Sequence, residues 1–383
     1  MIARLAIPII LAILLTWYYL DRYYWRKMKP RWKRWLLWLF PVAAIWATGL
    51  HAMEKDYFPD NIYHLFYFLD AFCVQIVPAI TFTLCAFIGR MLKRVKAGEC
   101  VGGVVATAIA LSWLWGTLVG FRQFEVVRVE YASTDLPEAF DGYRIVQFSD
   151  AHVGTLIGNR ESILRRAIDS INAQGADLVV FAGDLQNKRA EEIERQRELL
   201  STIHAKDGVY AVMGNHDYAE YLDVRPAEKP YYCQRTADAI KSLGWHLLTN
   251  SHAVVRRDSS EIIIAGMEND GEGRFPQLGD VLQTLRGVSY DAFIVMIEHD
   301  PTSWRRKILP QCHAQLTLSG HTHDGQMSLF GWSPAQLIYR ECHGFYSEGD
   351  RALYVSKGLG GVVPFRLGNK GEIVVITLKS KKR

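Results

Sequence analysis

Four long apolar stretches lie within the first third of the chain, at residues 5–20, 36–50, 65–88 and 101–121. A helix needs about 20 apolar residues to cross the hydrocarbon core of a bilayer. The last two stretches reach that length, and apolar flanking residues extend the first two. A cleaved signal peptide is the alternative for the first stretch, but it predicts one apolar run rather than four. We therefore predict a membrane anchor of about four transmembrane helices in residues 1–124.

The basic residues of the chain are concentrated in this anchor. Residues 1–124 contain 14 Lys and Arg against 6 Asp and Glu, a net charge of +8. Residues 125–383 contain 30 against 34, a net charge of −4. Because nucleic-acid-binding domains normally have a basic surface, no nucleic acid is expected as a partner. A mononucleotide or cyclic nucleotide needs no such surface and stays open as a substrate.

The segments between the apolar stretches differ in charge. Residues 21–34 and 89–99 are rich in Lys and Arg, whereas residues 51–64 contain one Lys, Lys55, and several acidic residues that include Asp56. Basic loops stay on the cytoplasmic side of a membrane. We therefore expect an integral membrane protein, of a bacterial inner (plasma) membrane, whose remaining residues are extracytoplasmic.

After residue 124, short β-rich runs alternate with helical patterns. Strands are predicted at residues 143–149, 177–182, 208–213, 291–297, 314–318 and 372–378, with further strands in residues 245–267. Apolar periodicity predicts helices at residues 159–174 and 190–204. Such alternation predicts an α/β domain, residues 125–383, in which sheets are covered by helices.

Five predicted strands end in polar clusters. These are Ser149-Asp150-Ala151-His152, Gly183-Asp184, Gly214-Asn215-His216-Asp217, Glu298-His299-Asp300-Pro301 and Ser319-Gly320-His321-Thr322-His323. The carboxyl ends of strands in an α/β sheet open into one crevice, so the clusters are expected to converge. Asp, His and Asn side chains bind divalent metals, and there are more of them than one ion needs. Two ions about 3.5–4 Å apart are the usual device for displacement at phosphorus.

Each cluster by itself has a simpler explanation. Gly-Asp after a strand is most often a turn, Asn215 is compatible with a turn, and His299 with a hydrogen-bonded core imidazole. His321 and His323 alone are modest evidence for a metal. Five clusters in order, each at a strand end and each with suitable ligand types, favour a metal site over these separate explanations.

This constellation resembles the calcineurin-like metallophosphoesterase superfamily, whose pattern is D-x-H, G-D, G-N-H-D/E, a lone His and G-H-T-H. Together with the apolar anchor and residues 354–360, it is similar to the YkuE-like membrane-anchored branch, which includes the transmembrane protein with metallophosphoesterase domain. The resemblance covers residues 143–383. It implies a two-sheet β-sandwich flanked by helices, the metallophosphoesterase fold, and two divalent metal ions such as Mn²⁺, Fe²⁺ or Zn²⁺.

The resemblance also implies a role for each matching residue. The first ion would be bound by Asp150, His152 and His323, the second by Asn215, His299 and His321, and both by Asp184. His216 would protonate the leaving-group oxygen, and Asp217 would orient the His216 ring. Asp324 departs from the Gly that this branch often has after the last His, which leaves the metal preference open.

The predicted function is hydrolysis of a phosphodiester, phosphomonoester or pyrophosphate bond by a hydroxide that bridges the two metal ions. The lipid bilayer is a predicted partner, and a lipid-linked substrate such as UDP-diacylglucosamine is favoured by the anchor. That substrate is made on the cytoplasmic side, whereas the charge pattern places the domain outside. Two alternatives remain: a nucleotide or cyclic-nucleotide phosphodiesterase, and a non-catalytic binding module stabilised by metal. The thiols of the domain are Cys233, Cys312 and Cys342, and the sequence does not indicate a pair among them.

Overall fold

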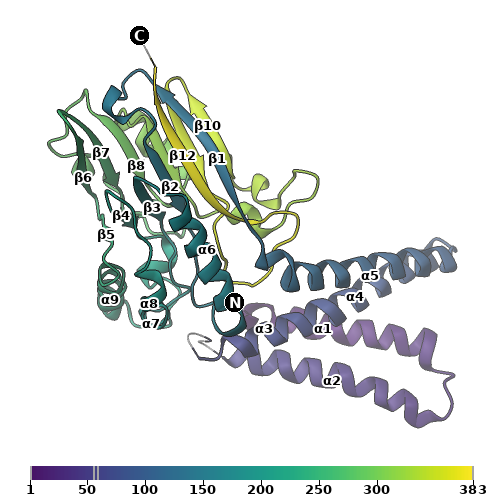
Figure 1. Ribbon diagram of the computed structural model, residues 1–383. Helices are drawn as coiled ribbons and strands as arrows, with labels where there is room; N and C mark the ends of the chain where they lie inside the picture. Colours follow the sequence, from purple (N-terminus) through teal and green to yellow (C-terminus); the bar gives the residue numbers. More distant parts are fainter. Residues whose placement is uncertain (1, 55–56, 58–59, 382–383) are drawn as a thin grey trace. The chain divides into compact units, whose positions relative to one another are not determined.

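The computed structural model describes residues 2–54, 57 and 60–381. The chain divides into two compact units, residues 1–119 and 120–383. The first unit is built from helices, and the second contains the β-sheets (Figure 1).

Four segments of the described chain are long and apolar enough to cross a membrane: Leu5–Trp25, Arg31–Met53, Ile62–Met91 and Val95–Arg122. Their helices are α1 (Ile2–Leu20), α2 (Arg31–Met53), α3 (Ile62–Ala71), α4 (Val77–Met91) and α5 (Val95–Leu118). Wider π-type turns at Asp21–Trp25 and Phe72–Ile76 extend α1 and join α3 to α4. The predicted set of four apolar helices is confirmed.

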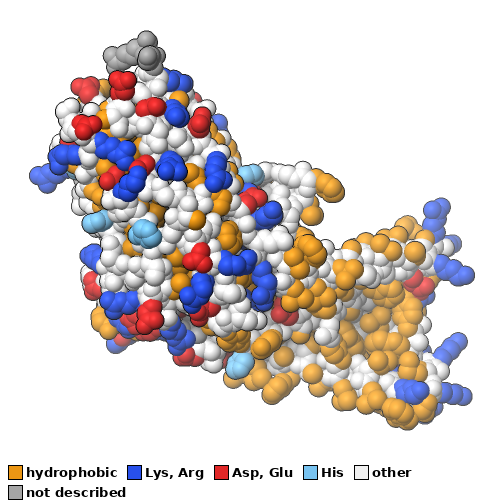
Figure 2. Space-filling model, viewed as in Figure 1, with side chains coloured by type: hydrophobic (Ala, Val, Ile, Leu, Met, Phe, Trp, Pro, Cys, Tyr) orange, Lys and Arg blue, Asp and Glu red, His pale blue; other side chains and the backbone are white. Residues whose placement is uncertain are grey.

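The helices continue further into the predicted basic loops than the apolar stretches indicated. α2 begins at Arg31 and α5 begins at Val95, so that Lys96 lies in a helix rather than in a loop. Lys and Arg favour helices, and their long side chains reach water from the end of a span. Figure 2 shows Lys and Arg gathered at one end of the helices of this unit and apolar side chains along their length. Lys55 and Asp56 of the predicted second loop lie outside the described residues.

Helices α4 and α5 pack closely because glycines lie where their backbones meet. A Cβ atom on Gly98 would lie 2.6 Å from the Cys85 carbonyl oxygen and 2.8 Å from the Gly89 Cα atom. Small residues at such positions let membrane helices approach each other, and van der Waals packing then holds them together.

The second unit contains two six-stranded sheets. The first sheet has the order β1-β12-β2-β3-β4-β5, and the second has the order β10-β11-β9-β8-β7-β6. The first is formed by β1 (Phe124–Ser133), β2 (Arg144–Phe148), β3 (Leu178–Ala182), β4 (Val209–Val212), β5 (His246–Leu247) and β12 (Gly371–Ser380). The second is formed by β6 (Ser251–Arg257), β7 (Ser260–Gly266), β8 (Phe293–Ile297), β9 (Leu316–Ser319), β10 (Gly344–Glu348) and β11 (Arg351–Val355). Strands β2 to β5 run parallel to one another, as do β7, β8, β9 and β11.

The two sheets share one apolar core. Along β3, Leu178 and Val180 pack against the inner face of the second sheet, whereas Val179 and Phe181 pack against helices. Successive side chains of a strand point to opposite faces, and every residue of β3 is buried. This explains why the strand is apolar throughout rather than alternating. The predicted two-sheet sandwich is confirmed.

Helices cover the outer faces of both sheets. The first sheet is covered by α6 (Glu161–Ala173), α7 (Ala190–Arg195), α8 (Arg197–Leu200) and α9 (Lys229–Lys241), and the second by α10 (Val281–Thr284), the turn Trp304–Ile308 and α11 (Leu309–Gln311). The single helix predicted at residues 190–204 is wrong, because the chain breaks between α7 and α8 at Gln196. The buried Gln196 side chain donates to the Leu156 carbonyl at 3.3 Å, and this hydrogen bond holds the chain in place at the break.

Candidate metal centre

The predicted site residues lie at the carboxyl ends of five strands. Asp150 and His152 follow β2, Asp184 follows β3, and Asn215 to Asp217 form a short turn after β4. In the second sheet, His299 follows β8, and His321 and His323 follow β9. Both sheets therefore contribute to one group of side chains, which are buried or nearly so.

The backbone at these positions is unusual. Asp150, His152, Asp184, His321 and His323 all have positive φ, between 44° and 74°. Non-glycine residues rarely adopt this conformation, and such strain tends to occur at functional sites. The five residues therefore point their side chains in directions that an ordinary strand-to-loop connection would not give.

One group of potential ligands lies around Asp150. The Nε2 atoms of His152 and His323 are 3.2 Å apart, and His323 Nε2 lies 3.3 Å from Asp150 Oδ1. Ligand atoms around a tetrahedral ion, at bond lengths of about 2.0 Å, are separated by about 3.3 Å. The three side chains are therefore spaced as ligands of a single ion would be.

Asp184 connects this group to a second one. Its Oδ2 atom lies 3.8 Å from His152 Nε2 and 3.2 Å from His299 Nε2. The rings of His299 and His321 are 5.2 Å apart, and His321 Nδ1 lies 2.7 Å from Asn215 Oδ1. The structure thus brings together all the residues that the sequence suggested as ligands, with Asp184 between the two groups.

One nitrogen of the His299 ring lies in a position that is suited to bind a cation. Its Nδ1 atom lies 2.7 Å from the Ala182 carbonyl oxygen, which can only accept, so Nδ1 holds a proton. The other nitrogen, Nε2, is buried without a hydrogen-bond partner and faces the Asp184 carboxylate. A lone pair opposite a carboxylate requires either a proton or a metal ion between them. A hydrogen bond that fixes the far nitrogen is the usual support of a metal-binding His.

The pKa values of these side chains also indicate that a proton or a metal ion is needed between Asp184 and His299. Burial raises the pKa of the Asp150 carboxyl to about 7 and lowers the pKa of the His152 imidazole to about 3. Burial also acts to raise the pKa of Asp184, but the His299 and His216 rings outweigh it and hold that pKa well below its usual value. Burial acts to lower the pKa of His299, and Asp184 reverses this, so that its pKa lies well above the usual value. A bound cation would take the place of the proton that Asp184 and His299 otherwise hold between them.

The His216 ring is oriented by a residue that the sequence did not suggest. Its Nδ1 atom lies 2.7 Å from the Asn187 carbonyl oxygen, and the ring stacks on Tyr221 at 4.1 Å between centroids. The prediction that Asp217 orients this ring is corrected. The Asp217 carboxylate instead accepts from backbone N–H groups, at 2.9 Å from Asp184 and 2.9 Å from Gly214. It holds together the turns that follow β3 and β4.

Three other side chains surround the group without having been predicted. The Tyr221 hydroxyl accepts from Asn215 Nδ2 at 2.8 Å, and the Tyr339 hydroxyl lies 3.0 Å from His321 Nε2. Arg366 is fully buried and donates to three carbonyls of residues 357–360. That segment in turn donates from the Gly360 N–H to the Asp150 carbonyl at 2.9 Å. Of these features, the sequence singled out only residues 357–360, which belong to the run 354–360 that the resemblance includes.

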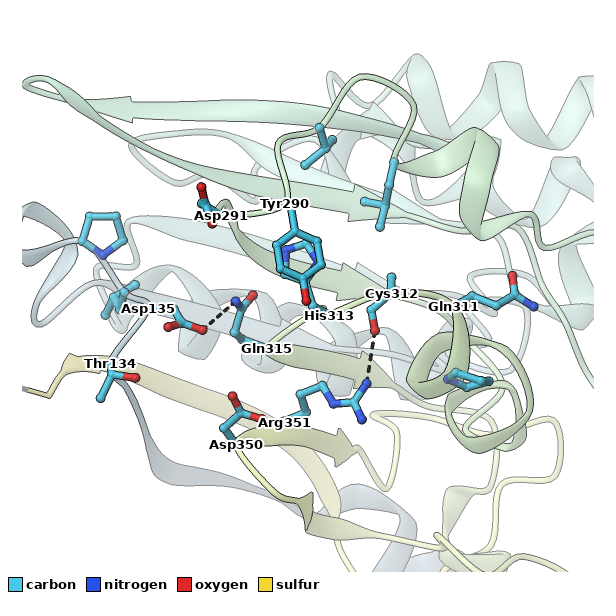
Figure 3. A pocket seen from close by; sticks show the side chains of 15 residues that line it. Thr134, Asp135, Tyr290, Asp291, Gln311, Cys312, His313, Gln315, Asp350 and Arg351 are labelled. Atoms are coloured by element: carbon cyan, nitrogen blue, oxygen red, sulfur yellow. Dashed lines mark hydrogen bonds between the residues drawn. The ribbon is translucent and has the colours of Figure 1, made fainter. Parts of the chain in front are cut away.

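A cavity of about 980 Å³ lies at the opposite ends of the strands (Figure 3). Its lining includes Asp291, two residues before β8, and Gln315, directly before β9, whereas the candidate site follows those strands. Within it, Gln315 donates to Asp135 at 3.1 Å and Arg351 donates to the Cys312 carbonyl at 3.1 Å. None of the predicted site residues lines this cavity.

Comparison with known proteins identifies the family. The calcineurin-like phosphoesterase family matches residues 143–325. The transmembrane protein with metallophosphoesterase domain of Danio rerio is 29% identical over 343 residues, covering 84% of this chain and 75% of that protein. The metallophosphoesterase YkuE of Bacillus subtilis is 32% identical over 308 residues, covering 76% of this chain and 99% of that protein. The UDP-2,3-diacylglucosamine pyrophosphatase LpxG of Chlamydia trachomatis is 25% identical over 327 residues, covering 71% and 94%.

Family members use a dinuclear metal centre, and the Asp and His clusters of the second unit provide groups that suit one. The apolar helices and the transmembrane relatives agree on a membrane protein. The chain therefore belongs to the calcineurin-like phosphoesterase family and is a membrane-bound, metal-dependent phosphoester hydrolase.

Proposed function

We propose that the two groups of side chains bind two divalent ions. Asp150, His152 and His323 hold the first ion, Asn215, His299 and His321 hold the second, and Asp184 contacts both. The arrangement that supports this most is His299, whose unpartnered Nε2 faces the Asp184 carboxylate at 3.2 Å. The 3.2 Å separation of the His152 and His323 nitrogens supports the first site in the same way.

When bound, such a pair of ions neutralises phosphoryl oxygens and lowers the pKa of a water molecule. The transfer of a proton to the leaving group depends on the protein's own side chains. His216 is outside the ligand set, and its Nδ1 is held by Asn187. Its second nitrogen therefore holds or donates a proton, and we assign to it protonation of the leaving-group oxygen. Tyr221, stacked on the ring, keeps the imidazole from rotating.

We further propose that the substrate is lipid-linked, with a phosphodiester or pyrophosphate bond. The segment from His323 to Tyr339 leaves the site and returns to it, since the Tyr339 hydroxyl lies 3.0 Å from His321 Nε2. Between them, five large apolar side chains are exposed: Leu329, Phe330, Trp332, Leu337 and Ile338. Exposed apolar side chains on one short segment beside a polar site suit an acyl chain better than water. The similarity to a UDP-2,3-diacylglucosamine pyrophosphatase supports the same class of substrate.

The substrate proposal is tested with the full-length protein in detergent and Mn²⁺. We expect hydrolysis of bis-p-nitrophenyl phosphate, and a much lower KM for UDP-2,3-diacylglucosamine than for UDP-N-acetylglucosamine, which lacks the long acyl chains. Equal KM values for the two sugar nucleotides would contradict a lipid-linked substrate. Absence of turnover with any phosphoester would contradict catalysis itself and favour a binding module.

The apolar segment is tested separately. Phe330→Ser with Trp332→Ser is expected to raise the KM for the acylated substrate about tenfold, since each buried CH₂ contributes about 0.8 kcal/mol. Hydrolysis of bis-p-nitrophenyl phosphate should not change. The matched control is Leu282→Ser, an exposed apolar residue on α10. If the double variant changes the hydrolysis of both substrates alike, the segment does not bind the acyl chains of the substrate.

We propose a bacterial inner membrane as the location, with the catalytic unit outside the cytoplasm. The connection between α1 and α2 and the turn between α4 and α5 are both rich in Lys and Arg, which favours the cytoplasmic side for both. A C-terminal alkaline phosphatase fusion, active only outside, should then be active. A silent fusion would place the catalytic unit in the cytoplasm, where UDP-diacylglucosamine is made.

A further inference from the structure

A second cluster of metal-binding side chains lies beside the first. Asp324 immediately follows His323, and Cys342 and His343 immediately precede β10. One ligand atom from each of the three lies within 4.8 Å of the other two. Asp324 and Cys342 are buried, and His343 is partly exposed. None of these side chains belongs to the ligand set proposed for the dinuclear centre.

The three side chains meet at one carboxylate oxygen. Asp324 Oδ1 lies 3.5 Å from Cys342 Sγ and 3.0 Å from His343 Nδ1. Around a tetrahedral zinc ion, with Zn–S of about 2.3 Å and Zn–N and Zn–O of about 2.0 Å, oxygen and sulfur are about 3.5 Å apart and oxygen and nitrogen about 3.3 Å. The two separations from Asp324 Oδ1 are therefore close to those around a shared ion.

Hydrogen bonds alone explain the cluster less well. His343 Nδ1 is buried and has no partner in hydrogen-bond geometry, although Asp324 Oδ1 is 3.0 Å away. The other carboxylate oxygen, Oδ2, accepts from Asn369 Nδ2 at 3.3 Å. Oδ1 is therefore available to the cluster. Asn369 orients the carboxylate in the way that supporting residues orient metal ligands. A thiolate and a carboxylate would together balance the charge of a divalent ion.

We propose that Asp324, Cys342 and His343 form a third metal site, which binds one zinc-like ion. A thiolate and an imidazole are ligands that Zn²⁺ favours, and the Cys342 thiol releases its proton to solvent on binding. The ion joins the turn that follows His323 to the start of β10. Since Ser333 also donates to the Asp324 carbonyl at 2.7 Å, the turn that positions His323 becomes fixed from both sides.

Cobalt substitution tests this site independently of catalysis. The full-length protein in detergent is stripped of metal and reloaded with Co²⁺. A thiolate bound to Co²⁺ gives a near-ultraviolet charge-transfer band, and the ligands proposed for the dinuclear centre include no thiolate. We expect the band in the wild type, its loss in Cys342→Ser, and a zinc content lower by one ion per chain in that variant and in His343→Ala.

Two controls separate this proposal from the others. Cys233→Ser removes a half-buried thiol of α9 and should retain the band. Asp184→Asn should retain the band while its activity is lost, so failure of the catalytic proposal would leave this result intact. A wild-type protein without the band, or a Cys342→Ser variant with unchanged zinc content, would overturn the third site and leave a hydrogen-bonded cluster.

Discussion

His216 shows how a single residue is prepared for proton transfer. Its ring is held on one side by the Asn187 carbonyl at 2.7 Å and on its face by Tyr221. Burial lowers the pKa of this imidazole from its usual value. The negative charge of a bound phosphoester would raise this pKa again, so the ring is expected to hold its second proton mainly when the substrate is bound.

We predict that His216→Ala lowers kcat by about 100- to 10,000-fold, the usual contribution of a general acid or base. Metal content should stay at the wild-type value, because His216 is not among the proposed ligands. Steady-state hydrolysis of bis-p-nitrophenyl phosphate and metal analysis of the same sample check both statements. Wild-type turnover in a metal-loaded variant would exclude His216 from the reaction.

The ligand types could be predicted because each lies directly after an apolar strand. Asp150, Asp184 and His299 are fixed within two residues of a strand end, so their convergence follows from the sheet. Tyr221 and Tyr339 reach the site from long connections, whose paths depend on packing rather than on periodicity. Asp217 was misassigned because its position next to His216 in sequence suggests contact, whereas its carboxylate turns toward backbone amides.

Strand β9 and the turn after it depend on a glycine at the site. A Cβ atom on Gly320 would lie 2.4 Å from Asp150 Oδ2 and 2.5 Å from Ser149 Oγ. We predict that Gly320→Ala displaces the Asp150 carboxylate and lowers metal affinity at least tenfold, within the range for residues that support metal ligands. Gly349→Ala is the control, because a Cβ atom there meets nothing within 4 Å although its φ is +65°. Equal metal affinity in the two variants would contradict the close approach.

Asp177, directly before β3, provides a test of acid stability at the end of the sheet opposite the candidate metal centre. Asp177 accepts from the Arg144 N–H at 2.8 Å and pairs with Lys206 and Arg257. Burial acts to raise the pKa of this carboxyl, but these partners outweigh it and the pKa lies below its usual value. The stability that Asp177 contributes is therefore present above its unfolded pKa of about 3.9. It is lost as the pH falls through the lower folded value.

We predict that Asp177→Asn costs about 2 kcal/mol at pH 7, in the range for hydrogen bonds to charged groups. The melting temperature of the full-length protein should fall by several degrees. The difference between wild type and variant should shrink as the pH is lowered below about 4. A difference that does not depend on pH would mean that the charge of Asp177 makes no contribution.

Most elements of the second unit were predictable, because buried strands are apolar runs bounded by polar clusters. Strand β1 (Phe124–Ser133) was not predicted. Its charged residues alternate with apolar ones at the edge of the sheet, and it pairs with β12 over its full length. Helix α9 was also missed, because its amphipathic pattern is weak: two tyrosines and three basic residues lie among its 13 positions. Strand β1 depends on β12, a partner that is distant in sequence.

At the scale of the whole chain, the charge distribution matches the two units. The helical part is basic and the catalytic part is slightly acidic, with net charges of +8 and −4 for residues 1–124 and 125–383. The basic excess therefore lies in the unit of apolar helices, as expected for Lys and Arg near the ends of membrane spans. Strand β1 begins two residues after the last apolar segment, Val95–Arg122. The catalytic unit therefore follows the apolar helices in the sequence with almost no linker.

The most direct test of the account is metal-dependent hydrolysis of bis-p-nitrophenyl phosphate by the full-length protein in detergent. The protein is first stripped with a chelator and then titrated with Mn²⁺, with Asp184→Asn measured alongside. We predict no hydrolysis by the stripped protein, recovery on addition of Mn²⁺, and no recovery in Asp184→Asn at any concentration. Undiminished hydrolysis after chelation, or recovery of Asp184→Asn to the wild-type rate, would contradict the proposed centre.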